Sequence, residues 1–137
     1  MKRQFTLRKY ERLKSRKLTE QLFKNGNSFA EVPFRVFYLP VNGELQKVNG
    51  LLFGCGVSKR NFKKAVDRNR IKRLIREAYR LQKNGLQELL ADRKDCLSLF
   101  ILYTGKELPD FNLVKEKLSV ILARLISVFS IEEKKKS

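Results

Sequence analysis

Residues 68–80 carry arginine and lysine side chains at a spacing suited to binding phosphate groups. They read Arg-Asn-Arg-Ile-Lys-Arg-Leu-Ile-Arg-Glu-Ala-Tyr-Arg. On an α-helix, which turns by about 100° per residue, Arg68, Lys72 and Arg76 would follow one another at intervals of about one turn. Like charges at that spacing repel one another, and no acidic residue lies between them. Because guanidinium and ammonium groups bind phosphate oxygens, the pattern predicts that a polyanion outside the chain supplies the negative charge.

The same segment also has an apolar side, so the helix would lie on a hydrophobic core. Its apolar residues recur at helical spacing; they are Ile71, Leu74, Ile75, Ala78 and Leu81. The opposite side would carry Arg68, Asn69, Lys72, Arg73, Arg76 and Arg80. Between residues 58 and 83 the only acidic residues are Asp67 and Glu77, whereas an ordinary solvent-exposed helix mixes charges of both signs. Phosphate binding explains this composition better than solubility does.

The whole chain is strongly basic. It has 137 residues, a formal net charge of +17 and an isoelectric point near 10.2. Because 42% of its residues are hydrophobic, the chain can bury one core. We expect a single domain at residues 1–131, with a loosely ordered basic segment at 1–11 and a disordered tail at 132–137. A positive field of this size favours polyanions, so nucleic acid is the leading class of partner and an anionic membrane surface the second.

Several classes of function lack the residues that they need. The most apolar stretch, residues 118–131, contains Arg124 and is too short to span a membrane, and residues 1–17 do not resemble a signal peptide. Cys55 and Cys96 are isolated, and the chain has no histidine to complete a zinc site. We expect free thiols in a reducing cytoplasm. No carboxylate cluster is suited to two-metal hydrolysis, so we expect neither catalytic residues nor a metal held by the protein alone.

Hydrophobic periodicity predicts an α+β fold, with a small mixed sheet and helices packed on it. The expected elements are a helix at residues 13–25, strands at 34–39 and 48–57 with room for a third, a long helix at 61–83, a strand at 97–103 and a helix after Pro109-Asp110. Asn42-Gly43 is a strong hairpin signal between the first two strands. Asn61 is the expected N-cap of the long helix. A break is expected at Gly85, followed by about one helical turn.

Residues 53–79 also resemble the signature of a known family. They include Gly-Val-Ser-Lys-Arg-Asn-Phe-Lys-Lys-Ala-Val-Asp-Arg-Asn-Arg-Ile-Lys-Arg-Leu-Ile-Arg-Glu-Ala, which is similar to the bacterial ribonuclease P protein component. In that family an Arg-Asn-Arg stretch is followed by Lys-Arg and then by Arg-Glu or Arg-Gln. The resemblance extends outward to the first helix, the first strand and the order of later elements, and so covers nearly the whole chain.

The resemblance implies a fold, an activity and a division of labour. The implied fold joins two parallel strands through the long helix by an unusual left-handed crossover, as in a domain of a small-subunit ribosomal protein, whereas general rules favour the right-handed sense. The implied activity is endonucleolytic removal of the 5′ leader from precursor tRNA in the cytoplasm. The implied catalyst is a large RNA with bound Mg²⁺, and the protein is an accessory subunit that binds both this RNA and the leader.

The resemblance also implies two groups of binding residues. The expected RNA-binding residues are Lys59, Arg60, Arg68, Asn69, Arg70, Lys72, Arg73, Arg76 and Arg80. A cleft between the first helix and the sheet would take the single-stranded leader, through Thr19, Phe23, Arg35 and Phe37. Aromatic faces beside cations suit single strands, because stacking contributes roughly 1–3 kcal/mol per base at any sequence. Which basic residues contact the catalytic RNA and which the leader stays open.

Two features depart from the family pattern. Thr19 occupies a position where the family often has an aromatic residue, so the cleft would lose one stacking surface. The segment before Ala65, residues 61–64, is about one residue longer than usual, so the entry into the long helix would be displaced.

Two other classes of protein remain open at this point. Composition alone would equally allow a ribosomal or rRNA-binding protein without enzymatic activity. A DNA-binding protein is less favoured, because strands rather than a helix precede the basic helix, unlike in helix-turn-helix readers.

Overall fold

The protein folds as an α+β structure around one four-stranded mixed sheet. The structure is a computed structural model that describes residues 16–41, 50–93 and 96–136. The strands are β1 (Asn27–Glu31), β2 (Phe34–Val41), β3 (Gly50–Val57) and β4 (Cys96–Tyr103), and their order in the sheet is β1-β2-β4-β3. β2 is antiparallel to both of its neighbours, whereas β3 and β4 are parallel.

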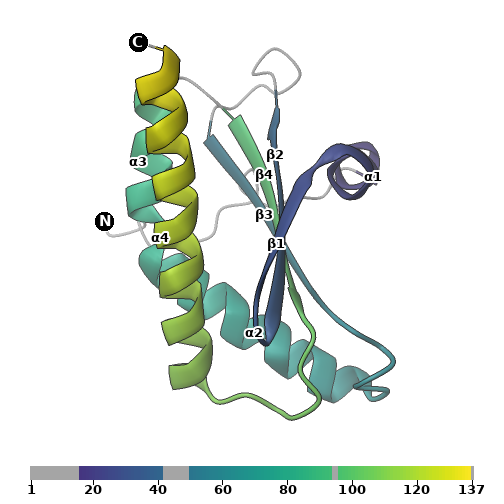
Figure 1. Ribbon diagram of the computed structural model, residues 1–137. Helices are drawn as coiled ribbons and strands as arrows, with labels where there is room; N and C mark the ends of the chain where they lie inside the picture. Colours follow the sequence, from purple (N-terminus) through teal and green to yellow (C-terminus); the bar gives the residue numbers. More distant parts are fainter. Residues whose placement is uncertain (1–15, 42–49, 94–95, 137) are drawn as a thin grey trace, which may run out of the picture.

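The helices divide between the two faces of the sheet. They are α1 (Arg16–Asn25), α2 (Ala65–Gln82), α3 (Asn84–Arg93) and α4 (Phe111–Lys136). α2, α3 and α4 lie on one face, and α1 lies on the other (Figure 1). We call the face toward α1 the open face, because this single short helix is the only described helix on it. At the end of α1, Gly26 makes the turn into β1, where a Cβ atom would lie 2.4 Å from the carbonyl oxygen of Leu22.

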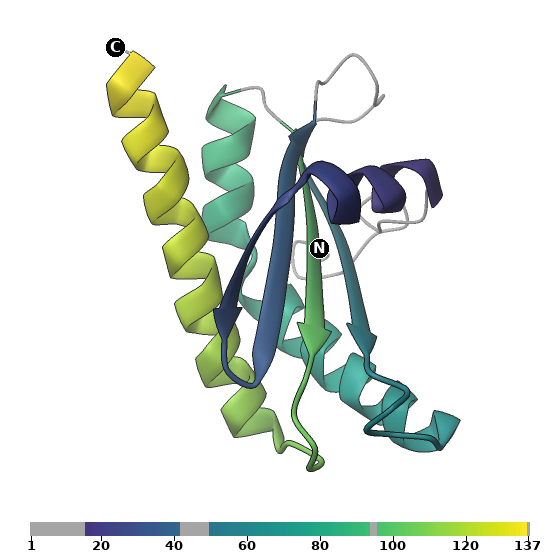
Figure 2. The same cartoon turned by 45° about the vertical axis from the view of Figure 1, so that its right-hand side comes forward.

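The connection between the parallel strands has the unusual hand. In Figure 2 both β3 and β4 point downward, and α2 and α3 pass behind the sheet from β3 on the right to β4 on its left. A parallel connection with this course is left-handed, opposite to the sense found in most proteins. The resemblance to the family therefore predicts the hand correctly, and the general rule does not.

The hydrophobic core lies between the sheet and the helices behind it. Val36, Leu99 and Ile101 alternate inward from β2 and β4 and are completely buried, as are Ile71 and Ile75 of α2. Leu118, Ile121 and Leu125 of α4 complete the same cluster. The ring of Phe53 on β3 stacks on that of Tyr79 on α2, with centroids 3.8 Å apart. The apolar stripe predicted for the basic helix therefore faces this core.

Strand pairing differs from the sequence prediction at two places. β1 is the additional strand, and it forms a hairpin with β2. The hairpin predicted at Asn42-Gly43 is wrong in its pairing, because β4 lies between β2 and β3. Residues 42–49 themselves lie outside the described part of the chain. β4 is long and apolar and pairs along all of both neighbours, so this non-local pairing overrides the local turn signal.

Helix boundaries differ as well. α2 begins at Ala65, not near residue 61, and its N-cap is Lys64, which makes no side-chain capping bond. α3 has ten residues where about one turn was expected. α4 begins after Asp110, whose carboxylate accepts a hydrogen bond from the Leu113 amide at 2.8 Å, and it continues to Lys136, so most of the expected disordered tail is helical.

The N-cap predicted at Asn61 is wrong for a specific reason. Its side-chain amide donates instead to the main-chain carbonyls of Thr104 and Gly105, each at 3.2 Å. These contacts join the turn before α2 to the segment after β4.

Among the described residues, no helix has the length and apolar character needed to cross a bilayer.

Candidate nucleic-acid interface

The exposed side of α2 carries most of the predicted basic residues. Ile71, Ile75, Ala78 and Tyr79 turn toward the core, and the opposite side of the helix is exposed at Asn69, Arg70 and Arg73. Within the part of the chain that the structure describes, neither Arg70 nor Arg73 forms an ion pair or a hydrogen bond. Their charges are therefore available to an external anion.

Of the predicted row Arg68, Lys72 and Arg76, the last two lie along the flank of α2 beside β3. The thiol of Cys55 on β3 donates to the main-chain carbonyl of Lys72, with a sulfur–oxygen distance of 3.8 Å. The positive charges of Arg76 and Lys72 both act on this thiol and lower its pKa. The row predicted from helical spacing is therefore present, but it borders the sheet instead of lying opposite the core. α2 presents cations in two directions.

Burial controls the chemistry of Cys55 despite these cations. It raises the pKa of the thiol from 9.0 to about 11, because removing the thiolate from water costs more than the attraction of Arg76 and Lys72 recovers. A reactive cysteine needs the opposite balance. Cys55 is a free thiol, as the sequence predicted, and it is suited to packing.

Arg68 is held by the protein itself. Its Nη1 atom donates to the main-chain carbonyls of Phe62 and Lys63, at 2.9 and 2.8 Å. Neither acceptor is charged, so the guanidinium keeps its full positive charge. Its position, however, is set by the turn that precedes α2.

Arg80 has a carboxylate partner. Its guanidinium pairs with Glu77 one turn earlier on the same helix, and both side chains are partly exposed. This arrangement offsets the charge of Arg80 in part. The predicted basic ridge therefore has no ion pair among the described residues at Arg68, Lys72, Arg73 and Arg76, whereas the prediction is wrong for Arg80.

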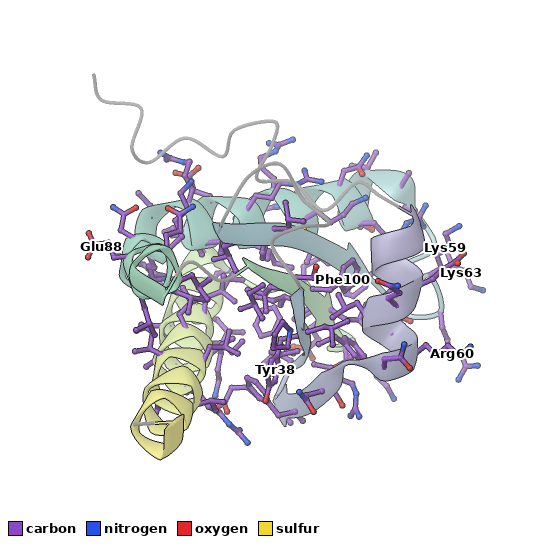
Figure 3. The ribbon with its side chains drawn as sticks, turned by 90° about the horizontal axis from the view of Figure 1, so that it is seen from above. Tyr38, Lys59, Arg60, Lys63, Glu88 and Phe100 are labelled. Carbon is purple, nitrogen blue, oxygen red and sulfur yellow. The ribbon has the colours of Figure 1, made fainter. Side chains whose placement is uncertain are left out.

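The turn at residues 58–64 adds a third group of cations. Lys59, Arg60 and Lys63 are exposed, and in Figure 3 their side chains project on the same side of the sheet as α1. Phe62 of the same turn points inward, and only 7% of its surface is exposed. The turn thus buries one aromatic side chain between exposed cations.

An aromatic cluster joins α1 to the open face. The ring of Phe23 on α1 makes edge contacts with Phe37 on β2 and Phe100 on β4, with centroid distances of 4.9 and 5.1 Å. Phe23 remains 47% exposed. Figure 3 shows Phe100 between the sheet and α1. The structure therefore brings the two predicted aromatic residues together and adds a third that sequence reasoning missed.

Arg35 and Thr19 flank this cluster. The guanidinium of Arg35 lies 5.7 Å from the ring centre of Phe37 and donates to the Ser28 hydroxyl at 3.3 Å. Arg35 and Phe37 thus share one face of β2, as alternation predicted. Thr19 precedes Phe23 by one turn of α1 and is partly buried. The residues predicted for the leader cleft thus combine aromatic edges with a cation, a combination that suits a single-strand site.

Gly56 leaves room for the ring of Phe100 beside β3. A Cβ atom at Gly56 would lie 2.9 Å from Cζ of Phe100 and 3.3 Å from its Cε1. The group that approaches the backbone of β3 at Gly56 is therefore this ring. Alternation along residues 97–103 could have placed Phe100 opposite Leu99 and Ile101, but the run is almost wholly apolar and hides which face each residue takes.

Within residues 16–41, 50–93 and 96–136, no group of three or more His, Cys, Asp or Glu side chains is placed to hold a metal ion.

This chain is similar to proteins of one family along most of its length. A family model described as Ribonuclease P matches residues 7–126. A protein from Porphyromonas gingivalis named ribonuclease P protein component is 36% identical over 121 residues, which cover 88% of this chain and 87% of that protein. One of the same name from Chlorobium phaeobacteroides is 34% identical over 127 residues, covering 85% and 86%.

Solved structures show the same fold. The ribonuclease P protein of Thermotoga maritima superposes with a TM-score of 0.65 at 28% identity, over 83% of this chain and 96% of that one. That of Staphylococcus aureus gives a TM-score of 0.66 at 23% identity, over 84% and 94%.

Proposed function

Because this chain belongs to the ribonuclease P protein family, we propose that it is the accessory protein subunit of ribonuclease P. In this role it binds a catalytic RNA and the 5′ leader of precursor tRNA, and it promotes hydrolytic removal of the leader in the cytoplasm. The observation that carries the proposal is the exposed side of α2, where Arg70 and Arg73 have no carboxylate partner in the described part of the chain.

The cations of α2 bind the catalytic RNA through its phosphates. Each phosphate that they neutralise releases condensed counterions, so affinity falls steeply as salt rises. Arginine suits this task better than lysine, because its planar guanidinium matches two phosphate oxygens at once. The flank row beside β3 and the exposed residues on the opposite side point in different directions, so α2 can contact two RNA segments that converge on it.

The cleft under α1 takes the leader. The exposed half of Phe23 and the partly exposed rings of Phe37 and Phe100 offer surfaces on which unpaired bases stack. Arg35 supplies a cation beside them. Stacking is tolerant of sequence, which suits a subunit that must accept the leaders of many precursor tRNAs.

The reacting atoms belong to the RNA in this proposal. Mg²⁺ is held mainly by the RNA and supplies charge stabilisation at the scissile phosphate. The protein contributes positive charge that screens RNA phosphates from one another, which strengthens substrate binding and favours Mg²⁺ occupancy on the RNA.

Cleavage of precursor tRNA at low Mg²⁺ tests the proposal. The ribonuclease P RNA of the same genome is assayed alone and with the protein. The proposal expects the protein to stimulate cleavage at low Mg²⁺ and to matter less as Mg²⁺ rises. Absence of stimulation, together with recovery of ribosomal particles by the tagged protein, would instead support an rRNA-binding role.

A further inference from the structure

Arg68 differs from the other basic residues of α2 in what its side chain contacts. It donates to two main-chain carbonyls, those of Phe62 and Lys63, and it is partly buried. Both carbonyls belong to the turn before α2, which lacks a side-chain cap at Lys64. A guanidinium with two hydrogen bonds from one nitrogen has its position fixed by the backbone that it contacts.

The turn that Arg68 holds carries exposed cations of its own. Lys59, Arg60 and Lys63 project from residues 58–64 on the side of the sheet where α1 lies (Figure 3). Flexible lysine and arginine side chains bind a defined RNA surface well only if the backbone that bears them has one conformation, because ordering that backbone on binding costs free energy. The turn contains neither helix nor strand to impose such a conformation.

Two further contacts fix the opposite side of the turn. Asn61 donates to the carbonyls of Thr104 and Gly105, and the Phe62 ring packs near Tyr103, with centroids 6.1 Å apart. The Phe62 amide donates to the Ser58 carbonyl at 3.1 Å. The turn is thus held on one side by β4 and the segment after it, and on the other side by Arg68 alone among the described contacts.

We infer that Arg68 is a positioning residue: it serves RNA binding by holding the 58–64 turn so that Lys59, Arg60 and Lys63 face the RNA, and not through a phosphate contact of its own. This inference rests on the proposed function and deepens it. It assigns the direct phosphate contacts to the exposed cations. Arg68, which helical spacing alone would group with those cations, instead positions the turn.

A double-mutant cycle separates the two roles. Affinity for the ribonuclease P RNA transcript is measured for Arg68→Ala in the wild-type background and in a background carrying Lys59→Ala, Arg60→Ala and Lys63→Ala. We expect Arg68→Ala to weaken binding about fivefold to tenfold in the wild-type background, as loss of two hydrogen bonds allows, and less than about twofold in the triple variant. Residues that act through one another are non-additive in this way.

Arg73→Ala is the matched control, since Arg73 lies exposed on the same helix. Its loss should be equal in both backgrounds, because its contact does not pass through the turn. Hydrogen exchange gives a readout without RNA: the Phe62 amide should exchange faster in Arg68→Ala, and in Arg68→Lys as well, while circular dichroism and the amides of α4 stay unchanged.

The outcomes are distinct. An equal loss from Arg68→Ala in both backgrounds, or unchanged exchange at Phe62, would overturn the inference and leave Arg68 as a phosphate contact. If the wild-type protein fails to bind the transcript or stimulate cleavage, the proposed function itself fails, whatever the exchange data show.

Discussion

Replacing Phe23 by alanine removes the ring that α1 contributes to the cleft. Phe23 touches both Phe37 and Phe100 by edge contacts and exposes 47% of its surface. If the exposed part stacks on one leader base, its loss costs roughly 1–3 kcal/mol of binding free energy. At about 1.4 kcal/mol per tenfold change, affinity for precursor tRNA should fall about fivefold to about 150-fold.

Loss of the ring also affects folding, so a matched variant is needed. Each aromatic pair contributes about 0.5–1.5 kcal/mol beyond area burial, so Phe23→Ala should lower the free energy of unfolding. Phe23→Leu keeps an apolar side chain at the end of α1 but has no aromatic face. We expect its stability to lie close to that of the wild type and its loss of leader affinity to resemble that of Phe23→Ala.

The assay compares substrates that differ only in the leader. Holoenzyme binding is measured for precursor tRNAs whose leaders lengthen one nucleotide at a time from none, at constant salt and Mg²⁺. The wild type should gain affinity over the first few nucleotides, and both variants should lose that gain. An equal loss for the leaderless substrate would refute the reasoning, because Phe23 would then act on the whole complex and not on the leader.

Three further predictions concern the positive charge of α2, the buried thiol of Cys55 and the ring of Phe100. Arg73→Glu should weaken RNA binding and reduce the slope of log affinity against log salt by about 0.7–0.9 or more. Lys115→Glu makes an equal charge change on α4 and should alter the slope little. Equal changes of slope in both variants would mean that only the net charge of the protein matters. For Cys55, the folded pKa is raised from 9.0 to about 11, so the protonated thiol favours the folded state below pH 9 and this contribution disappears as pH rises through 11. Denaturant titrations at a series of pH values give the free energy of unfolding of the wild type and of Cys55→Ala. The difference between the two should fall by on the order of 2–3 kcal/mol over this pH range. A difference that stays constant with pH would contradict the burial argument. Gly56→Ala should displace the ring of Phe100, whose Cζ would lie 2.9 Å from the new Cβ. The resulting overpacking should lower the free energy of unfolding by about 1–3 kcal/mol. Leader binding should weaken while affinity for the RNA subunit stays unchanged. Leader binding equal to that of the wild type would show that the Phe100 ring does not contribute to the leader site.

Helical and strand periodicity predicted most elements of this fold, but not all. The apolar stripe of α2 and the strand at Phe34–Val41 follow directly from repeating patterns. β1, with sequence Asn-Ser-Phe-Ala-Glu, has too few apolar residues to show a pattern, and it exists because β2 offers it a partner. A strand that depends on its pairing partner in this way shows little signal in its own sequence.

The candidate site was predictable in composition and less so in geometry. A helical projection places Arg68, Lys72 and Arg76 in one row, but it cannot show that the row borders β3 or that Arg68 turns back to the chain. Phe100 was missed because its strand is apolar on both faces. Asn61 was misassigned because its acceptors, Thr104 and Gly105, are distant in the sequence.

Site-specific photocrosslinking tests most directly whether the two surfaces bind the two RNAs assigned to them. A benzophenone amino acid replaces Phe23 in one protein and Arg73 in another, and each is irradiated in the assembled holoenzyme with precursor tRNA. The proposed assignment of the two surfaces predicts that position 23 crosslinks to leader nucleotides and position 73 to the catalytic RNA. Crosslinks from position 73 to the leader alone, or from position 23 only to the catalytic RNA, would contradict it.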